Sequence, residues 1–245
     1  MTNYKLTIQY EGTRYNGWQK QGNTKNTIQG KMEEILLKLC GRPVEIHGSG
    51  RTDAGVHAAA QVANFKADIK LSTDELRDYF NRYLPEDIGV ISVEIAGDRF
   101  HARLSAKSKT YVYRIWKSPI PDVFGRRIRY TLTEKLNTEN MRRCAEVMCG
   151  TQDFAAFCSN KKSKKSTVRT VYSIHIEETE NEYIFTFHGN GFLYNMVRIM
   201  TGTLVEAGRE KLSPAEVSEI LKGKKRERAG YTAPPEGLML ETVEY

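Results

Sequence analysis

One segment of the chain reads His47-Gly48-Ser49-Gly50-Arg51-Thr52-Asp53-Ala54-Gly55-Val56-His57. Its three glycines allow tight turns and a close approach of the backbone to another group. Residues 43–47 before the segment and residues 61–65 after it have the composition of strands. A turn that leads to a returning strand, and not to a helix, favours antiparallel pairing over a doubly wound parallel sheet.

Strand and helix patterns alternate along the rest of the chain. Strands are predicted over residues 4–10, 88–95, 108–116, 168–176, 183–188 and 238–243. Helices are predicted after a capping box at residues 26–29, after Ser72, over residues 138–149 and 192–207, and after Ser213. This order predicts an α+β fold with two lobes of mostly antiparallel sheet flanked by helices, over residues 1–104 and 105–245. The chain shows no sequence repeat that would indicate a duplication.

The composition is ordinary for a globular protein. Of the 245 residues, 40% are hydrophobic and 27% are charged, and no apolar run approaches the roughly 18 residues of a membrane span. The first residues lack the basic and apolar pattern of a signal peptide, so we expect a cytoplasmic location. The four cysteines form no Cys-x-x-Cys pair, which argues against a zinc site and for reduced thiols.

The formal net charge of +7 indicates an affinity for polyanions, of which nucleic acid is the commonest. Lysine and arginine gather in three runs, over residues 161–169, 222–228 and 126–129. A single charge run is usually only a solvated face. Three runs on one chain favour a surface that contacts phosphates.

Asp53 has three interpretations. A phosphate-binding loop is disfavoured, because the segment lacks the Gly-x-x-x-x-Gly-Lys-Ser/Thr pattern and leads toward a strand. An Asx turn, in which the side chain bonds to its own backbone, is the common role of aspartate in such loops. A catalytic carboxylate is the third interpretation. It is favoured by Arg51 two residues away, which can pair with a phosphate or with the carboxylate.

The neighbours of Asp53 restrict its chemistry. A glycosidase generally needs two acids, and the sequence around Asp53 supplies no second one, since Asp68 lies in a stretch that we expect to be exposed. His47 and His57 do not have a recognised metal-ligand spacing, and such histidines are more often hydrogen-bonding scaffold.

Two further segments carry residues suited to catalysis. Residues 192–207 are apolar almost all round, so the arginine among them, Arg198, needs a partner or must reach the surface. One such partner is a buried carboxylate that stays ionised as a nucleophile, and Asp53 is the natural candidate. The predicted strand 108–116 carries Tyr111 and Tyr113, and either could stack on a base or simply pack in the core.

These segments together resemble the TruA family of tRNA pseudouridine synthases. The resemblance is carried by Gly50-Arg51-Thr52-Asp53-Ala54-Gly55-Val56-His57, by Ala106-Lys107-Ser108-Lys109-Thr110-Tyr111, and by Phe192-Leu193-Tyr194-Asn195-Met196-Val197-Arg198. It extends to residues 10–19, 153–157 and 233–238, and so it spans nearly the whole chain.

The resemblance implies a pseudouridine synthase fold with a basic active-site cleft between the two lobes. It implies that Asp53 is the nucleophile that detaches uracil from its ribose so that the base rejoins through C5, and that Arg198 pairs with Asp53. Tyr111 would stack on the target uracil, Arg51 would hold the nucleotide out of its stack, and Leu238 would pack beneath the base. The family acts on uridines 38, 39 and 40 in the anticodon stem-loop of tRNA. It needs no metal or organic cofactor and forms homodimers that bind tRNA across both subunits.

Two other classes of protein compete with this enzyme. A non-catalytic RNA-binding protein would keep the basic runs but would tolerate the loss of Asp53, Tyr111 and Arg198. A metal-dependent nuclease would need further acids that converge on Asp53. Because all three residues are intact, we favour an isomerase that converts uridine to pseudouridine in tRNA.

Overall fold

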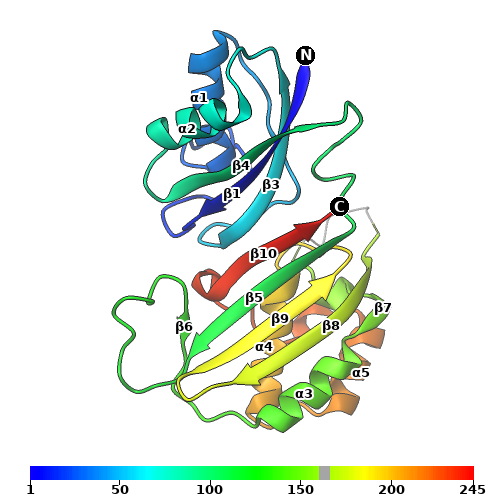
Figure 1. The fold of residues 1–245 in the computed structure, drawn as a ribbon. Helices are drawn as coiled ribbons and strands as arrows, with labels where there is room; N and C mark the ends of the chain where they lie inside the picture. The colour runs from blue at the N-terminus through cyan, green and yellow to red at the C-terminus, as the bar shows by residue number, and fades with distance from the viewer. Residues whose placement is uncertain (160–165) are drawn as a thin grey trace. The chain divides into compact units, whose positions relative to one another are not determined.

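The computed structural model describes residues 1–159 and 166–245. Its contacts divide the chain into two compact units, the first formed by residues 1–107 and 239–245 and the second by residues 108–238. The sequence-based division leaves the last strand in the C-terminal lobe, whereas contacts group residues 239–245 with the first unit. The elements of both units are labelled in Figure 1.

The first unit contains one sheet of mostly antiparallel strands. Its strands are β1 (Thr2–Tyr10), β2 (His47–Gly48), β3 (His57–Ala67), β4 (Ile88–Ala96) and β10 (Leu238–Glu244). Strand β1 pairs antiparallel with β3 on one side and with β4 on the other. The far edge of β3 is shared, because β2 pairs with it antiparallel at Asn64 and β10 pairs with it parallel at His57.

Two helices belong to this sheet, α1 (Ile28–Cys40) and α2 (Thr73–Tyr83), and they lie on one side of the strands in Figure 1. Helix α1 begins at the Thr27 cap, whose hydroxyl accepts the N–H of Gly30. The cap of α2 is reciprocal, since Ser72 and Glu75 each bond the other's backbone N–H. Both helices bury a short apolar stripe, formed in α1 by Ile28, Met32, Ile35 and Leu36 and in α2 by Leu76 and Phe80.

The main strands of the second unit follow one another in the order β5-β9-β8-β7. These strands are β5 (Ser108–Trp116), β7 (Gly150–Asp153), β8 (Val168–Glu178) and β9 (Glu182–Gly189), and the three pairings between them are antiparallel. A short strand, β6 (Tyr130–Thr131), pairs parallel with the end of β5.

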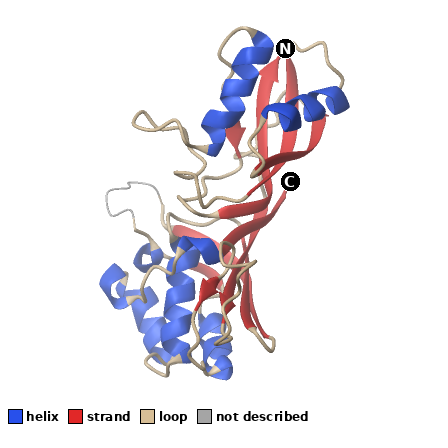
Figure 2. Cartoon of the chain, turned by 90° about the vertical axis from the view of Figure 1, so that its left-hand side faces the viewer, coloured by secondary structure: helices blue, strands red, loops and turns tan. Residues whose placement is uncertain are grey.

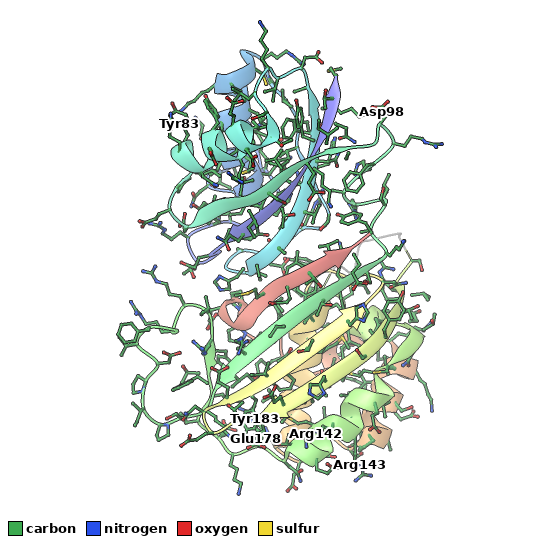
Figure 3. The ribbon with its side chains drawn as sticks, in the orientation of Figure 1. Tyr83, Asp98, Arg142, Arg143, Glu178 and Tyr183 are labelled. Carbon is green, nitrogen blue, oxygen red and sulfur yellow. The ribbon has the colours of Figure 1, made fainter. Side chains whose placement is uncertain are left out.

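Three helices cover one face of this sheet, as Figure 2 shows. They are α3 (Thr138–Val147), α4 (Met196–Gly208) and α5 (Pro214–Gly223). Three short 3-10 turns complete the unit, η1 (Ala155–Phe157), η2 (Arg226–Arg228) and η3 (Pro235–Gly237). Helix α3 is tied to the sheet by Arg142, whose Nε donates to the carbonyl of Ile176 at 3.1 Å; Arg142 and the end of β8 at Glu178 are labelled in Figure 3.

The prediction of an α+β fold with mostly antiparallel sheet is confirmed. Two predicted elements differ from the structure. Residues 43–46 form no strand, and only His47 and Gly48 pair with β3. Helix α4 begins at Met196 and not at residue 192, because Asn195 adopts a left-handed conformation with φ of 61° that a helix cannot continue through. Among the described residues, no helix is long and apolar enough to cross a membrane.

Candidate active site

The loop that carries Asp53 connects β2 to β3 and is held by backbone hydrogen bonds. Trp18 N–H donates to the carbonyl of Thr52 at 3.0 Å, and Gly55 N–H donates to that of Tyr15 at 3.3 Å. Val56 N–H donates to the carbonyl of Asp53 at 3.1 Å and so closes a tight turn. The Asp53 side chain is half-buried. The backbone around the carboxylate is therefore fixed from three sides.

Buried polar side chains anchor the same loop from the sheet. Gln61 on β3 has no exposed surface; it accepts the hydroxyl of Ser49 at 2.6 Å and donates to the carbonyl of Gly50 at 3.2 Å. The hydroxyls of Tyr10 and Thr52 are 2.8 Å apart, and burial raises the pKa of Tyr10 to about 12. The sequence alone does not predict these roles. The available signal was a glutamine that stands directly between apolar residues of a strand, because such a group is buried only with partners.

Two glycines allow neighbouring segments to pack against this loop. A Cβ atom at Gly12 would stand 2.0 Å from the carbonyl oxygen of Val56. A Cβ atom at Gly17 would stand 2.6 Å from the carbonyl oxygen of Thr52, and Gly17 also has a φ of +86°. No side chain fits at either position without moving the loop.

The two histidines at the ends of the loop have structural contacts. His57 is 1% exposed, and its Nδ1 accepts the N–H of Gly12 at 2.9 Å. His47 stacks on His101 with ring centroids 5.0 Å apart. Over residues 1–159 and 166–245, no group of three His, Cys, Asp or Glu side chains is placed to hold a metal ion.

In the second unit, the two tyrosines of β5 have different surroundings. Tyr113 has no exposed surface, and its hydroxyl donates to the carbonyl of Pro234 at 2.7 Å. Its ring also lies 2.6 Å from where a Cβ atom of Gly237 would be. Tyr111 keeps 8% exposure and meets the ring of Phe192 edge-on at 5.3 Å. Of the two residues, only Tyr111 keeps any exposed surface.

Arg198 lies in the first turn of α4 and is half-buried. Its Nε donates to the carbonyl of Ala233 at 2.7 Å, and its Nη1 donates to Oδ1 of Asn195 at 3.2 Å. The left-handed backbone of Asn195 thus places an acceptor beside Arg198. The segment that follows Ala233 leads through η3 to Leu238, which is 5% exposed.

The structure distributes the predicted site residues over the two units. Asp53 and Arg51 share one loop of the first unit, and Tyr111, Arg198 and Leu238 belong to the second. Within the second unit, residues 233–238, which end at Leu238, bond to segments that are distant in sequence. The carbonyl of Ala233 accepts from Arg198, and that of Pro234 accepts from Tyr113. No local sequence pattern signals these contacts.

Many cations of the basic runs have acidic or carbonyl partners within the chain. Lys224 Nζ lies 2.7 Å from Asp153 Oδ2. Arg129 pairs with both Asp122 and Glu182, and Arg226 donates to the carbonyl of Gly230 at 2.9 Å. Lys161, Lys162, Lys164 and Lys165 of the first run lie outside the described residues. Runs 222–228 and 126–129 therefore serve packing as well as surface charge.

The chain is similar to known proteins over its whole length. A family model described as tRNA pseudouridine synthase matches residues 6–104 and 144–245. The chain is 47% identical to tRNA pseudouridine synthase A of Bacillus sp. (strain KSM-64) and 44% identical to tRNA pseudouridine synthase A 1 of Clostridium tetani (strain Massachusetts / E88), each over 100% of both chains. A solved structure of a Cbf5-Nop10-Gar1 complex has a TM-score of 0.38 at 14% identity over 95% of this chain and 50% of that chain, a likeness too weak to bear on function.

Proposed function

Because the chain belongs to the tRNA pseudouridine synthase family, we propose that it isomerises uridine to pseudouridine in tRNA. The observation that carries the proposal is the loop of Asp53, whose backbone is bonded on several sides while its carboxylate remains half-buried. The reaction breaks the bond from N1 of uracil to C1′ of the ribose and forms one from C5 to C1′. C5 gives up its proton to solvent, and N1 takes up a proton in its place. No atom is added, so the enzyme has only to hold and redirect the base.

Each site residue has a proposed role. Asp53 is the nucleophile, and Arg198 pairs with it so that the carboxylate stays ionised. Tyr111, which keeps 8% exposure, stacks on the target uracil. Arg51 holds the nucleotide out of its stack, which an enzyme acting on a stacked base requires. Leu238 packs beneath the base.

The finer parts of the proposal rest on the resemblance to the TruA family. The target uridines are those at positions 38, 39 and 40 of the anticodon stem-loop. The enzyme works as a homodimer that binds tRNA across both subunits, in the cytoplasm. The net charge of +7 supports a polyanionic substrate.

Tritium release from tRNA labelled at C5 of uridine tests the reaction. The wild-type protein should release tritium, and Asp53→Ala should release none while it still binds tRNA. Persistent release by Asp53→Ala would refute the nucleophile. A wild-type protein that binds tRNA without releasing tritium would instead be the non-catalytic RNA-binding protein. Sequencing of the product tRNA then shows which uridines were modified.

Arg198→Met tests the proposed ion pair. Methionine keeps the aliphatic bulk of the side chain but removes the charge, so we expect a folded protein whose rate falls about a hundredfold or more, as when one pre-organised charged partner is removed from an active site. The carbonyl of Ala233 also loses its donor, at a cost of about 1 kcal/mol in unfolding free energy. Near-normal turnover would show that Arg198 does not support the nucleophile.

A further inference from the structure

A chain of side-chain amides connects Arg51 to helix α1. Arg51 Nε donates to Oε1 of Gln19 at 2.9 Å, and Gln19 Nε2 donates to Oε1 of Gln29 at 2.6 Å. Gln29 Nε2 then donates to Oε1 of Glu33 at 2.9 Å. This series of hydrogen bonds begins at the guanidinium of Arg51 and ends at the carboxylate of Glu33. In both glutamines the oxygen faces the Arg51 end and the NH2 group faces the Glu33 end.

The direction of these amides is fixed by the backbone around Gln29. Its Oε1 also accepts the N–H of Lys20 at 2.9 Å, and its Nε2 also donates to the carbonyl of Ile46 at 3.2 Å. The side chain is 5% exposed, so water does not replace these partners. A flipped amide would set its NH2 group against an N–H and its oxygen against a carbonyl. Gln29 therefore offers its oxygen to Gln19, and Gln19 offers its own oxygen to Arg51.

This arrangement determines which atoms of Arg51 are left to meet a nucleotide. The guanidinium is held through Nε, on the edge that faces Gln19. Within the described part of the chain, its two Nη groups have no hydrogen-bond partner. An exposed arginine otherwise samples many rotamers, and ordering it on binding costs side-chain entropy. Holding it in advance lowers that cost when the base is extruded.

We propose that Gln19 and Gln29 are positioning residues that orient the Nη groups of Arg51 toward the extruded nucleotide. The proposal rests on the proposed function, in which Arg51 holds the target uridine out of its stack. Lys20 completes the arrangement, because its Nζ lies 2.8 Å from Oε2 of Glu33. This ion pair fixes the carboxylate at the end of the hydrogen-bond series.

The test compares two anticodon stem-loops under single-turnover conditions, one with its target uridine paired and one with the uridine opposite a pyrimidine. A mismatched base costs less to extrude, so it depends less on the group that holds it out. The variants are Gln19→Leu, Arg51→Ala and the double variant. Gln19→Ala is measured in parallel, so that a folding defect of one substitution does not decide the result. Gln21→Leu is the matched control, since Gln21 is an exposed glutamine of the same loop whose side chain donates to the carbonyl of Asn16.

We expect Gln19→Leu and Gln19→Ala to slow the paired substrate by about tenfold, the size expected for one hydrogen bond to a charged group. The mismatched substrate should recover most of that loss, and the double variant should be no slower than Arg51→Ala. Gln21→Leu should match the wild type on both substrates. Equal slowing on both substrates, or effects of Gln19 and Arg51 that multiply, would overturn the proposal. A wild-type protein that forms no pseudouridine in either substrate would instead refute the proposed function.

Discussion

At the scale of single residues, Gly12 tests how tightly the Asp53 loop is held. A Cβ atom there would stand 2.0 Å from the carbonyl oxygen of Val56, and the N–H of Val56 closes the turn onto Asp53. Because backbone cannot move aside as a flexible side chain can, Gly12→Ala must displace the loop. We expect unfolding free energy to fall by about 1–3 kcal/mol or more. We also expect tritium release to fall well below that of the wild type.

Gly97→Ala is the control for this substitution. Nothing lies within 4 Å of a Cβ atom at Gly97, and its φ is not positive. Alanine at such a position should be neutral or add up to about 1 kcal/mol, since it restricts the unfolded chain. Urea unfolding measures both variants. If Gly12→Ala were as stable and as active as Gly97→Ala, the close packing against Val56 would be wrong.

At the scale of elements, Asp153 connects the end of β7 to the end of α5. Its carboxylate lies 2.7 Å from Lys224 Nζ, and Oδ1 accepts the hydroxyl of Thr167 at 2.5 Å and the N–H of Ala155 at 3.1 Å. The bond from Lys224, followed by that from Thr167, holds the pKa of the Asp153 carboxyl below its usual value, against the opposite effect of burial. The folded state thus favours the charged carboxylate.

This lowered pKa makes a prediction about stability and pH. A group whose pKa is lower in the folded than in the unfolded state contributes stability above its unfolded pKa, and that contribution is lost as the pH falls through the folded value. Asp153→Asn keeps an oxygen for Thr167 and Ala155 but has no charge for Lys224. We therefore expect it to be less stable than the wild type at pH 7, with a difference that shrinks under acid.

Thermal unfolding between pH 7 and pH 3 measures that difference. The control variant is Asp98→Asn, because Asp98, labelled in Figure 3, is exposed. The control should follow the wild type at every pH. A gap between Asp153→Asn and the wild type that stays constant with pH would show that the carboxylate does not titrate as proposed.

Elements whose ends are set by neighbouring residues could be predicted from the sequence. Ser72 and Ser213 start helices because each bonds a glutamate three residues later, and this signal is local. Helix α4 was placed too early, because its apolar pattern runs through Asn195 while the left-handed turn there depends on contacts of the folded chain. Tyr113 bonds in the core to Pro234, 121 residues away. The sequence pattern of β5 therefore does not show which of its two tyrosines packs in the core.

At the scale of the molecule, the last seven residues complete the first unit after the chain has formed the second. Met239 and Leu240 pair with β3, the carbonyl of Glu244 accepts the N–H of Lys107, and the hydroxyl of Tyr245 donates to Ala102. The residues of a strand show that it pairs with another strand, but they do not show which one. The sequence therefore predicts only that this segment belongs to the lobe nearest in the chain. The same limit applies to Asp53 and Arg198, which belong to different units.

Because β10 pairs with β3, we expect a destabilising substitution in β10 to destabilise the first unit. Leu240 has no exposed surface, so Leu240→Ala should lower unfolding free energy by about 2–5 kcal/mol. Glu241→Ala, at the adjacent exposed position, should change little. Hydrogen exchange resolves where the loss falls, because each unit has its own set of internal contacts and can open separately. Amides of β1 and β3 should lose protection while those of β8 and β9 keep theirs. Equal loss in both sheets would mean that the two units unfold as one.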